Sequence, residues 1–125
     1  MRRRERVVLD FFDELRSLDV NVDEGLERVM GDGDLYAMML DMFVTAIDTT
    51  PIRPEEFDGS PLDDLIGKVH TLKGTTGNLS IQPLFTRYTQ SLSLLREGKP
   101  AEAKAVYLEL LPFQEKILDC IKRHQ

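Results

Sequence analysis

Two of the chain's 125 residues are histidines, and one of them lies where an imidazole could do chemistry. His124 is the penultimate residue, so we expect it to be frayed and assign it no role. His70 lies in the middle of a segment with helical periodicity. On a helical wheel it points about 120° away from the apolar stripe of that segment. The pattern therefore predicts a solvent-exposed imidazole.

Three glycines and a lysine accompany His70 on the exposed side of this helix. Gly67, Gly74, Gly77 and Lys73 all lie within about 60° of it on the wheel. Each interior glycine costs a helix about 1 kcal/mol relative to alanine, so three on one face indicate a surface kept clear for another protein. An exposed imidazole beside a cation suggests a histidine that accepts and passes on a phosphoryl group. Two alternatives stay open, because Gly77 could be a left-handed C-cap and Lys73 a solvated surface lysine.

The helix that carries His70 is predicted from its apolar spacing and its expected cap. Its buried stripe consists of Leu65, Val69, Leu72, Thr76 and Leu79. Ser60, followed by Pro61 in the first turn, is expected to begin this helix. Ser80 is expected to cap the next helix, and Pro112 is expected to kink or split the final one, over residues 101–122.

Earlier segments complete an all-helical pattern. Helical periodicity covers residues 2–18, a short turn of helix covers 23–30, and a third stripe covers 35–47. Asp32, Gly33 and Asp34 are interpreted as the start of the third helix, and Met38, Met39 and Met42 as part of the core. We predict an all-α fold, an antiparallel four-helix bundle over residues 20–125 with an additional N-terminal helix over residues 1–19.

Composition and charge exclude several classes of function. The formal charge is −6, which makes nucleic acid an improbable partner, and no apolar run is long enough to cross a membrane. The single cysteine, Cys120, forms neither an internal disulfide nor a cysteine zinc site, and we expect no bound metal. The three arginines after Met1 lack the apolar stretch of a signal peptide, so we expect a cytoplasmic protein.

The segment Val69–Leu79 resembles the signature of histidine phosphotransfer (HPt) domains. It reads VHTLKGTTGNL, and the family core is His-x-Leu-Lys-Gly followed by small residues and an aliphatic. The resemblance extends to the stretches GLER, GDGDLY and LDMF, and to the residues from Leu92 to Gly98, so that it covers roughly residues 20–121. One departure is Ser80, where family members commonly have glycine.

The resemblance implies a phosphoryl carrier without an ATP site of its own. His70 would accept the phosphoryl group from a receiver-domain aspartate or a kinase, and Lys73 would stabilise its charge. Contacts to the partner are expected from Ile66, Gly67, Gly74 and Gly77. The implied partners are response-regulator receiver domains, which supply the Mg²⁺, and a hybrid sensor histidine kinase. The following helix would add a polar or basic residue, and Thr89, Leu92, Ser93 and Arg96 stay open for that role.

Two other interpretations compete with this one. The chain could be an interaction module that binds receivers or a kinase without carrying phosphate, or an unrelated helical scaffold with a coincidental motif. The short length and the initial methionine favour a free-standing protein over a domain of a hybrid kinase. We expect a monomer, although the first helix, with Phe11, Phe12 and Leu15, could either cover the bundle or form a dimer contact.

Overall fold

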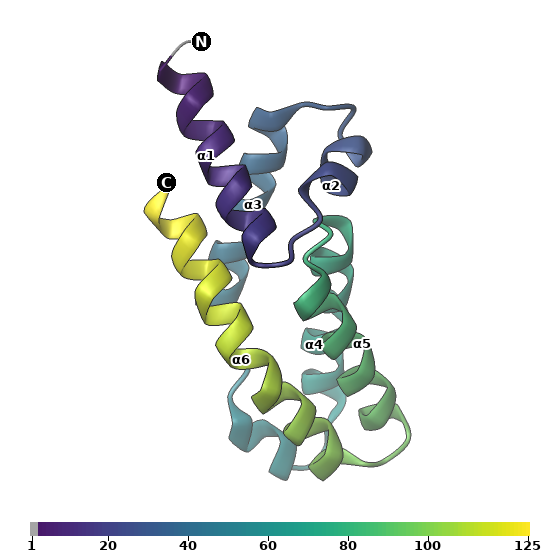
Figure 1. Cartoon of the computed structure of the whole chain (residues 1–125). Helices are drawn as coiled ribbons and strands as arrows, with labels where there is room; N and C mark the ends of the chain where they lie inside the picture. The colour runs from purple at the N-terminus through teal and green to yellow at the C-terminus, as the bar shows by residue number, and fades with distance from the viewer. Residues whose placement is uncertain (1–2) are drawn as a thin grey trace.

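The computed structural model describes residues 3–125, apart from the side chain of Arg4, and this part of the chain consists of helices joined by short connections (Figure 1). The elements are α1 (Arg3–Ser17), α2 (Val22–Arg28), α3 (Gly33–Thr49), the short 3₁₀ helix η1 (Pro54–Asp58), α4 (Asp63–Asn78), α5 (Gln82–Arg96) and α6 (Pro100–Arg123). Within residues 3–125 there is no strand, and one isolated bridge joins Val20 to Ile81. The all-α prediction is confirmed. Arg2, where the first helix was expected to begin, lies outside the described residues.

The helices pack around one apolar core, and α6 has the largest number of helical neighbours. It contacts α5, α3, α1 and η1, while α4 packs against α5 (Figure 1). The largest fully buried side chains come from α1, α3, η1, α5 and α6, and from the turn that follows α4; they include Leu15, Tyr36, Phe43, Phe57, Leu79, Tyr88 and Leu110. No helix of the described chain combines the length and apolar character needed to cross a bilayer.

The first helix, α1, contributes directly to this core. Phe11, Phe12 and Leu15 are buried, and the Phe12 ring meets Tyr36 of α3 edge-on, with 5.6 Å between ring centroids. Of the two roles considered for this helix, these three side chains therefore perform the first, which is to cover the bundle. Burial of three large apolar side chains contributes about 1.5–3 kcal/mol each to stability, so α1 is an integral part of the fold.

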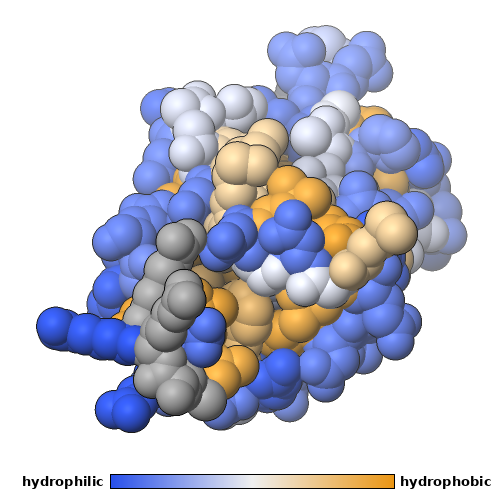
Figure 2. Space-filling view, turned by 90° about the horizontal axis from the view of Figure 1, so that it is seen from above, coloured by the Kyte–Doolittle hydropathy of each residue, from blue (hydrophilic) through white to orange (hydrophobic). Residues whose placement is uncertain are grey.

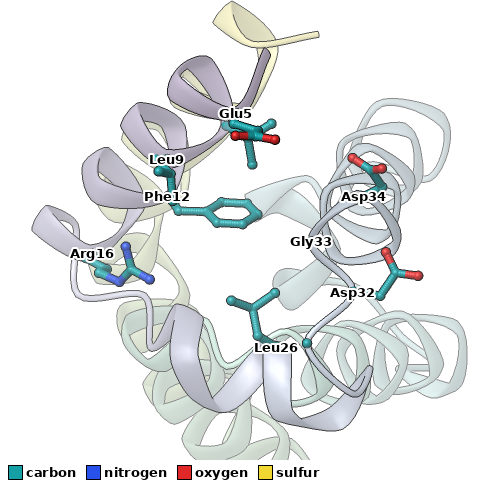
Figure 3. A pocket seen from close by; sticks show the side chains of 10 residues that line it. Glu5, Leu9, Phe12, Arg16, Leu26, Asp32, Gly33 and Asp34 are labelled. Carbon is teal, nitrogen blue, oxygen red and sulfur yellow. The ribbon is translucent and has the colours of Figure 1, made fainter. Parts of the chain in front are cut away.

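A hollow lies between α1, α2 and the start of α3, at the end of the molecule seen from above in Figure 2. Figure 3 shows Phe12 and Leu26 pointing into it, with Asp32 and Asp34 at its edge. Apolar side chains are visible there among hydrophilic ones (Figure 2). The hollow explains why Leu9, on the same helix as the buried Phe12, stays 44% exposed.

Asp32 begins α3 as the sequence predicted. Its side chain accepts a hydrogen bond from the Leu35 backbone N–H at 3.0 Å, which satisfies one of the free donors at the helix start. Gly31, just before it, has φ of +79°, a conformation that costs glycine nothing. The short helix expected over residues 23–30 is likewise present as α2.

The predicted start of α4 at Ser60 is wrong. The N-cap is Leu62, it makes no side-chain capping bond, and the Ser60–Pro61 peptide is cis. Asp63 and Asp64 occupy the first turn instead, where carboxylates interact favourably with the positive end of the helix dipole. The start of α4 is thus stabilised by two carboxylates rather than by a hydroxyl cap.

Pro112 does not split the last helix, since α6 is one helix of 24 residues with Pro112 inside it. A proline removes one N–H and leaves the carbonyl four residues earlier without its partner. Here both Pro112 and Leu108 lie on the exposed side of the helix. Leu110 and Ile117, on the opposite side, are buried and hold the helix against the core.

Two of the three methionines of α3 are not core residues, which corrects the prediction made for Met38 and Met42. Met38 is 53% exposed and Met42 is 63% exposed, whereas Met39 is partly buried and packs against the core. The buried side chains of α3 are instead Tyr36, Leu40, Phe43 and Val44. These side chains repeat at three and four residues and face the core, which turns Met38 and Met42 outward.

Candidate functional site

Helix α4 presents His70 to solvent because its opposite face is fully used by the core. Leu65, Val69, Leu72, Thr76 and Leu79 are each at most 5% exposed, as the periodicity predicted. His70 lies at the centre of the helix and is exposed. The helical spacing alone therefore fixes the direction of the imidazole, and the prediction of an exposed His70 is confirmed.

The two lysines of α4 differ in what they bind. Lys68 donates a hydrogen bond to Glu56 of η1 at 2.7 Å and another to the carbonyl of Pro51 at 3.3 Å. Lys73, one turn after His70, is partly buried, and its side-chain ammonium forms no hydrogen bond or ion pair with any residue of the described chain. The Lys73 ammonium is therefore available to an anion bound at His70, whereas Lys68 is committed to the fold.

The three glycines near His70 have two different roles. A Cβ added at Gly67 or at Gly74 would meet no atom within 4 Å, so these two leave open space beside the imidazole. A Cβ at Gly77 would lie 2.9 Å from Cε2 of Phe85, which means that Gly77 makes room for a ring of α5. Gly77 also lines a surface groove with Lys73 and Gly74, and its contact with a partner stays a prediction. Ile66 is partly buried, and its side chain packs against the core, so it offers a partner only part of its surface.

The four residues considered on the helix after His70 also separate. Leu92 is buried, and the Thr89 hydroxyl donates to the carbonyl of Phe85 at 2.7 Å. Ser93 and Arg96 are exposed. Ser93 and Arg96 are therefore the two polar side chains of this set that are open to solvent.

Shallow grooves lie on both sides of the exposed face of α4. One is lined by residues of α3 and α4, among them Met39, Met42 and Thr75. The other groove runs toward α5 and α2 and is lined by Lys73, Gly74, Gly77, Gln82, Phe85, Glu24 and Arg28. The first groove is mainly apolar, and the second is lined by charged as well as uncharged residues. The outward methionines are the part of this surface that sequence analysis missed, because helical periodicity allowed them to be interpreted as core.

The turn between α4 and α5 is built on Ser80, but Ser80 is not the helix cap that was predicted. The N-cap of α5 is Ile81, and Ser80 has φ of +57°. Its hydroxyl donates to the Glu24 carboxylate at 2.7 Å and accepts a hydrogen bond from Arg28. Arg28 also donates to Glu24, and the hydrogen bonds from Ser80 and Arg28 lower the pKa of that carboxyl. The buried hydroxyl of Ser80 thus joins α2 to the end of α4.

Two substitutions at Ser80 separate the hydroxyl from the backbone conformation. Ser80→Ala should destabilise the protein by about 1 kcal/mol, because the hydrogen bonds are lost and the positive φ is kept. Ser80→Gly should be more stable than Ser80→Ala by about 1 kcal/mol, since glycine adopts positive φ without strain. Urea unfolding of the three proteins measures both differences. Equal midpoints for Ser80→Ala and the wild type would contradict the role given to the hydroxyl.

The comparisons with known proteins found no similar protein. No family model matches the chain, and neither a curated protein nor a solved structure is significantly similar to it. The chemistry of the site is therefore judged from its residues. An exposed imidazole is a nucleophile and a base, Lys73 supplies positive charge one turn away, and two open glycines leave space for a second macromolecule.

Proposed function

We propose that this chain is a histidine phosphotransfer protein that carries a phosphoryl group on His70 between the aspartates of receiver domains. One observation carries the proposal: His70 is exposed at mid-helix between the open glycines Gly67 and Gly74, with Lys73 unpaired beside it. These residues belong to the segment that resembles the HPt signature. A structural histidine would require none of this arrangement.

The arrangement of helices supports the proposal. We assign α3, α4, α5 and α6 as the antiparallel four-helix bundle, with α1 and α2 as additions that cover one end of it (Figure 1). In this assignment α4 is the second bundle helix, and Gly67, His70 and Gly74 lie on its exposed face. A receiver domain would approach the bundle from that face.

The proposed reaction is an in-line displacement at phosphorus. The lone pair of the His70 Nε2 attacks the phosphoryl group of an aspartyl phosphate, the N–P bond forms, and the aspartate carboxylate leaves with the electrons of the P–O bond. The Nδ1 proton stays on the ring. Lys73 offsets negative charge on the phosphoryl oxygens during transfer. The Mg²⁺ would be held by the acidic residues of the receiver, and the same steps in reverse would phosphorylate the next receiver.

A methionine on one flank of α4 offers a partner an apolar surface. Met42 of α3 lines a shallow groove with Thr75 of α4 and is 63% exposed, and methionine adapts its shape to different partners. Receiver domains are the partners proposed for this surface, and a hybrid sensor histidine kinase is the proposed original source of phosphate. The protein would act as a carrier rather than as an enzyme, in the cytoplasm where such kinases release their phosphate.

The test is transfer of labelled phosphate from a phosphorylated receiver domain to the purified protein in the presence of Mg²⁺. We expect label on the protein within minutes, in a form that is labile to acid and stable to base, as a phosphoramidate is. The label should return to an unphosphorylated receiver when one is added. Binding of receivers without any label would overturn the carrier function and leave an interaction module. Failure both to bind and to take up label, from a panel of receivers, would exclude this class of partner.

A further inference from the structure

Three side chains that can bind a metal ion converge where α1 meets the end of α6. They are Glu14 of α1, Cys120 of α6, and His124, which follows α6 as its C-cap. One donor atom from each, a carboxylate oxygen, Sγ and a ring nitrogen, lies within 4.8 Å of the other two. The pair Glu14 Oε1 and His124 Nε2 is 3.7 Å apart. Glu14 is separated from the other two residues by more than 100 positions, so the cluster arises only in the folded chain.

His124 is held in this cluster, which corrects the expectation that it is frayed. Its side chain is 20% exposed, and its ring stacks on Phe11 with 4.6 Å between centroids and 25° between planes. Cys120 precedes it by four residues, so both side chains lie on the same face of the helix. Stacking fixes the plane of the imidazole, and the helix fixes its spacing from the thiol.

The neighbours of the cluster position the carboxylate and balance its charge. Arg123 donates to both oxygens of Glu14, and also to Asp119 at 3.0 Å. These hydrogen bonds lower the pKa of Glu14 to about 2, while burial and the Glu14 carboxylate raise the pKa of the Cys120 thiol to about 12. With a divalent ion bound to one thiolate and one carboxylate, and with the Arg123–Asp119 pair beside them, the charges sum to zero.

We propose that Glu14, Cys120 and His124 form a site for a divalent transition-metal ion, with zinc as the best fit, that ties α1 to the C-terminal end of α6. Sulfur, imidazole nitrogen and carboxylate oxygen together suit zinc. Tetrahedral zinc places its ligand atoms ~3.3–3.8 Å apart, so binding draws the three donors together by up to about 1 Å. Glu14 Oε1 would bind the ion and Oε2 would keep Arg123, which acts as the outer hydrogen-bond partner of the ligand.

Binding forms three bonds from the protein to the ion and breaks one S–H bond. The Cys120 thiol releases its proton to the solvent as the Zn–S bond forms, and the imidazole donates the lone pair of Nε2. Solvent reaches the cluster on the side of Glu14, whose side chain is 33% exposed. A water molecule from that side would complete four-coordination. A single cysteine forms no recognisable ligand spacing in the sequence, so the prediction was that no metal is bound.

The experiment is titration of the reduced, metal-free protein with Co²⁺, followed by displacement with Zn²⁺. We expect a thiolate-to-cobalt charge-transfer absorption that saturates at one ion per chain and disappears when zinc is added. Cys120→Ser should abolish that absorption, and His124→Gln should weaken zinc binding about 100-fold or more in calorimetry. Asp13→Asn, which changes an exposed carboxylate next to Glu14, is the matched control and should bind as the wild type does.

The cobalt spectrum of the wild-type protein decides the matter even if a variant fails to fold. Absence of the charge-transfer absorption, together with absence of calorimetric zinc binding, would overturn the proposal. Zinc binding that survives Cys120→Ser unchanged would overturn it too, since the ion would then lie elsewhere. A rise in the Tm of the wild type on adding zinc, absent from Cys120→Ser, supports the link between α1 and α6.

Discussion

Replacing His70 by glutamine is expected to remove all transferable phosphate from the protein and to leave its thermal unfolding unchanged. Glutamine is similar in size and polarity but has no nucleophilic ring nitrogen, so no phosphoramidate can form. The stability should change by less than about 0.5 kcal/mol, because the side chain is exposed and makes no hydrogen bond within the described residues. Receiver-to-protein transfer and a thermal melt, run on the same preparation, measure both effects.

Thr71→Ala is the matched control for this experiment. Thr71 is exposed, is adjacent to His70 in α4, and donates its hydroxyl to the carbonyl of Gly67 at 3.0 Å. We expect transfer to this variant at close to the wild-type rate. Label that remained on His70→Gln would show that another residue accepts the phosphoryl group, and the proposed function of His70 would be wrong.

Gly25→Ala is expected to destabilise the protein by about 2 kcal/mol, which corresponds to a fall of about 8 °C in Tm. An added Cβ would lie 2.5 Å from Cε1 of Tyr36 and 3.1 Å from the carbonyl oxygen of Leu79. Tyr36 is fully buried and donates its hydroxyl to that same carbonyl at 2.8 Å, so its ring has no free direction in which to move. The overpacking should cost about 3 kcal/mol of stability, which exceeds the gain of about 1 kcal/mol from the higher helix propensity of alanine.

The control for Gly25→Ala is Gly67→Ala, which makes the same chemical change at an open position. Nothing lies within 4 Å of a Cβ at Gly67, so this variant should gain up to about 1 kcal/mol from helix propensity alone. Urea unfolding and thermal melts of the two variants should therefore shift in opposite directions. Shifts of the same sign would contradict the close packing assigned to Gly25.

Local periodicity was sufficient to predict which face of α4 is buried and which is exposed. The spacing of Leu65, Val69 and Leu72 fixed both the buried stripe and the exposed direction of His70, because side-chain direction along a helix depends only on position within it. The cap at Asp32 was predictable for the same reason, since its hydrogen bond reaches only three residues along the chain. Almost all of the candidate site on α4 could therefore be predicted from residues that are close together in sequence.

The features that a local pattern left undecided or predicted wrongly depend on contacts between different elements of the fold. Gly74 and Gly77 are alike in sequence, and only the Phe85 ring distinguishes an open glycine from one that makes room for a neighbour. Serine is a common N-cap residue, but the Ser80 hydroxyl instead donates a hydrogen bond to Glu24, which lies 56 positions earlier in the chain. A pattern confined to a few residues contains no information on such partners.

What the sequence by itself determined is therefore the set of helices, the exposed imidazole and the lysine beside it, all of which follow from the repeat of a single helix. The tertiary structure decided the rest. It turned Met38 and Met42 outward, closed Gly25 against Tyr36, and joined Cys120 and His124 to a carboxylate from the other end of the chain. Those outcomes depend on how helices pack against one another, because each helix has several faces of similar apolarity and only the neighbours select which of them is buried.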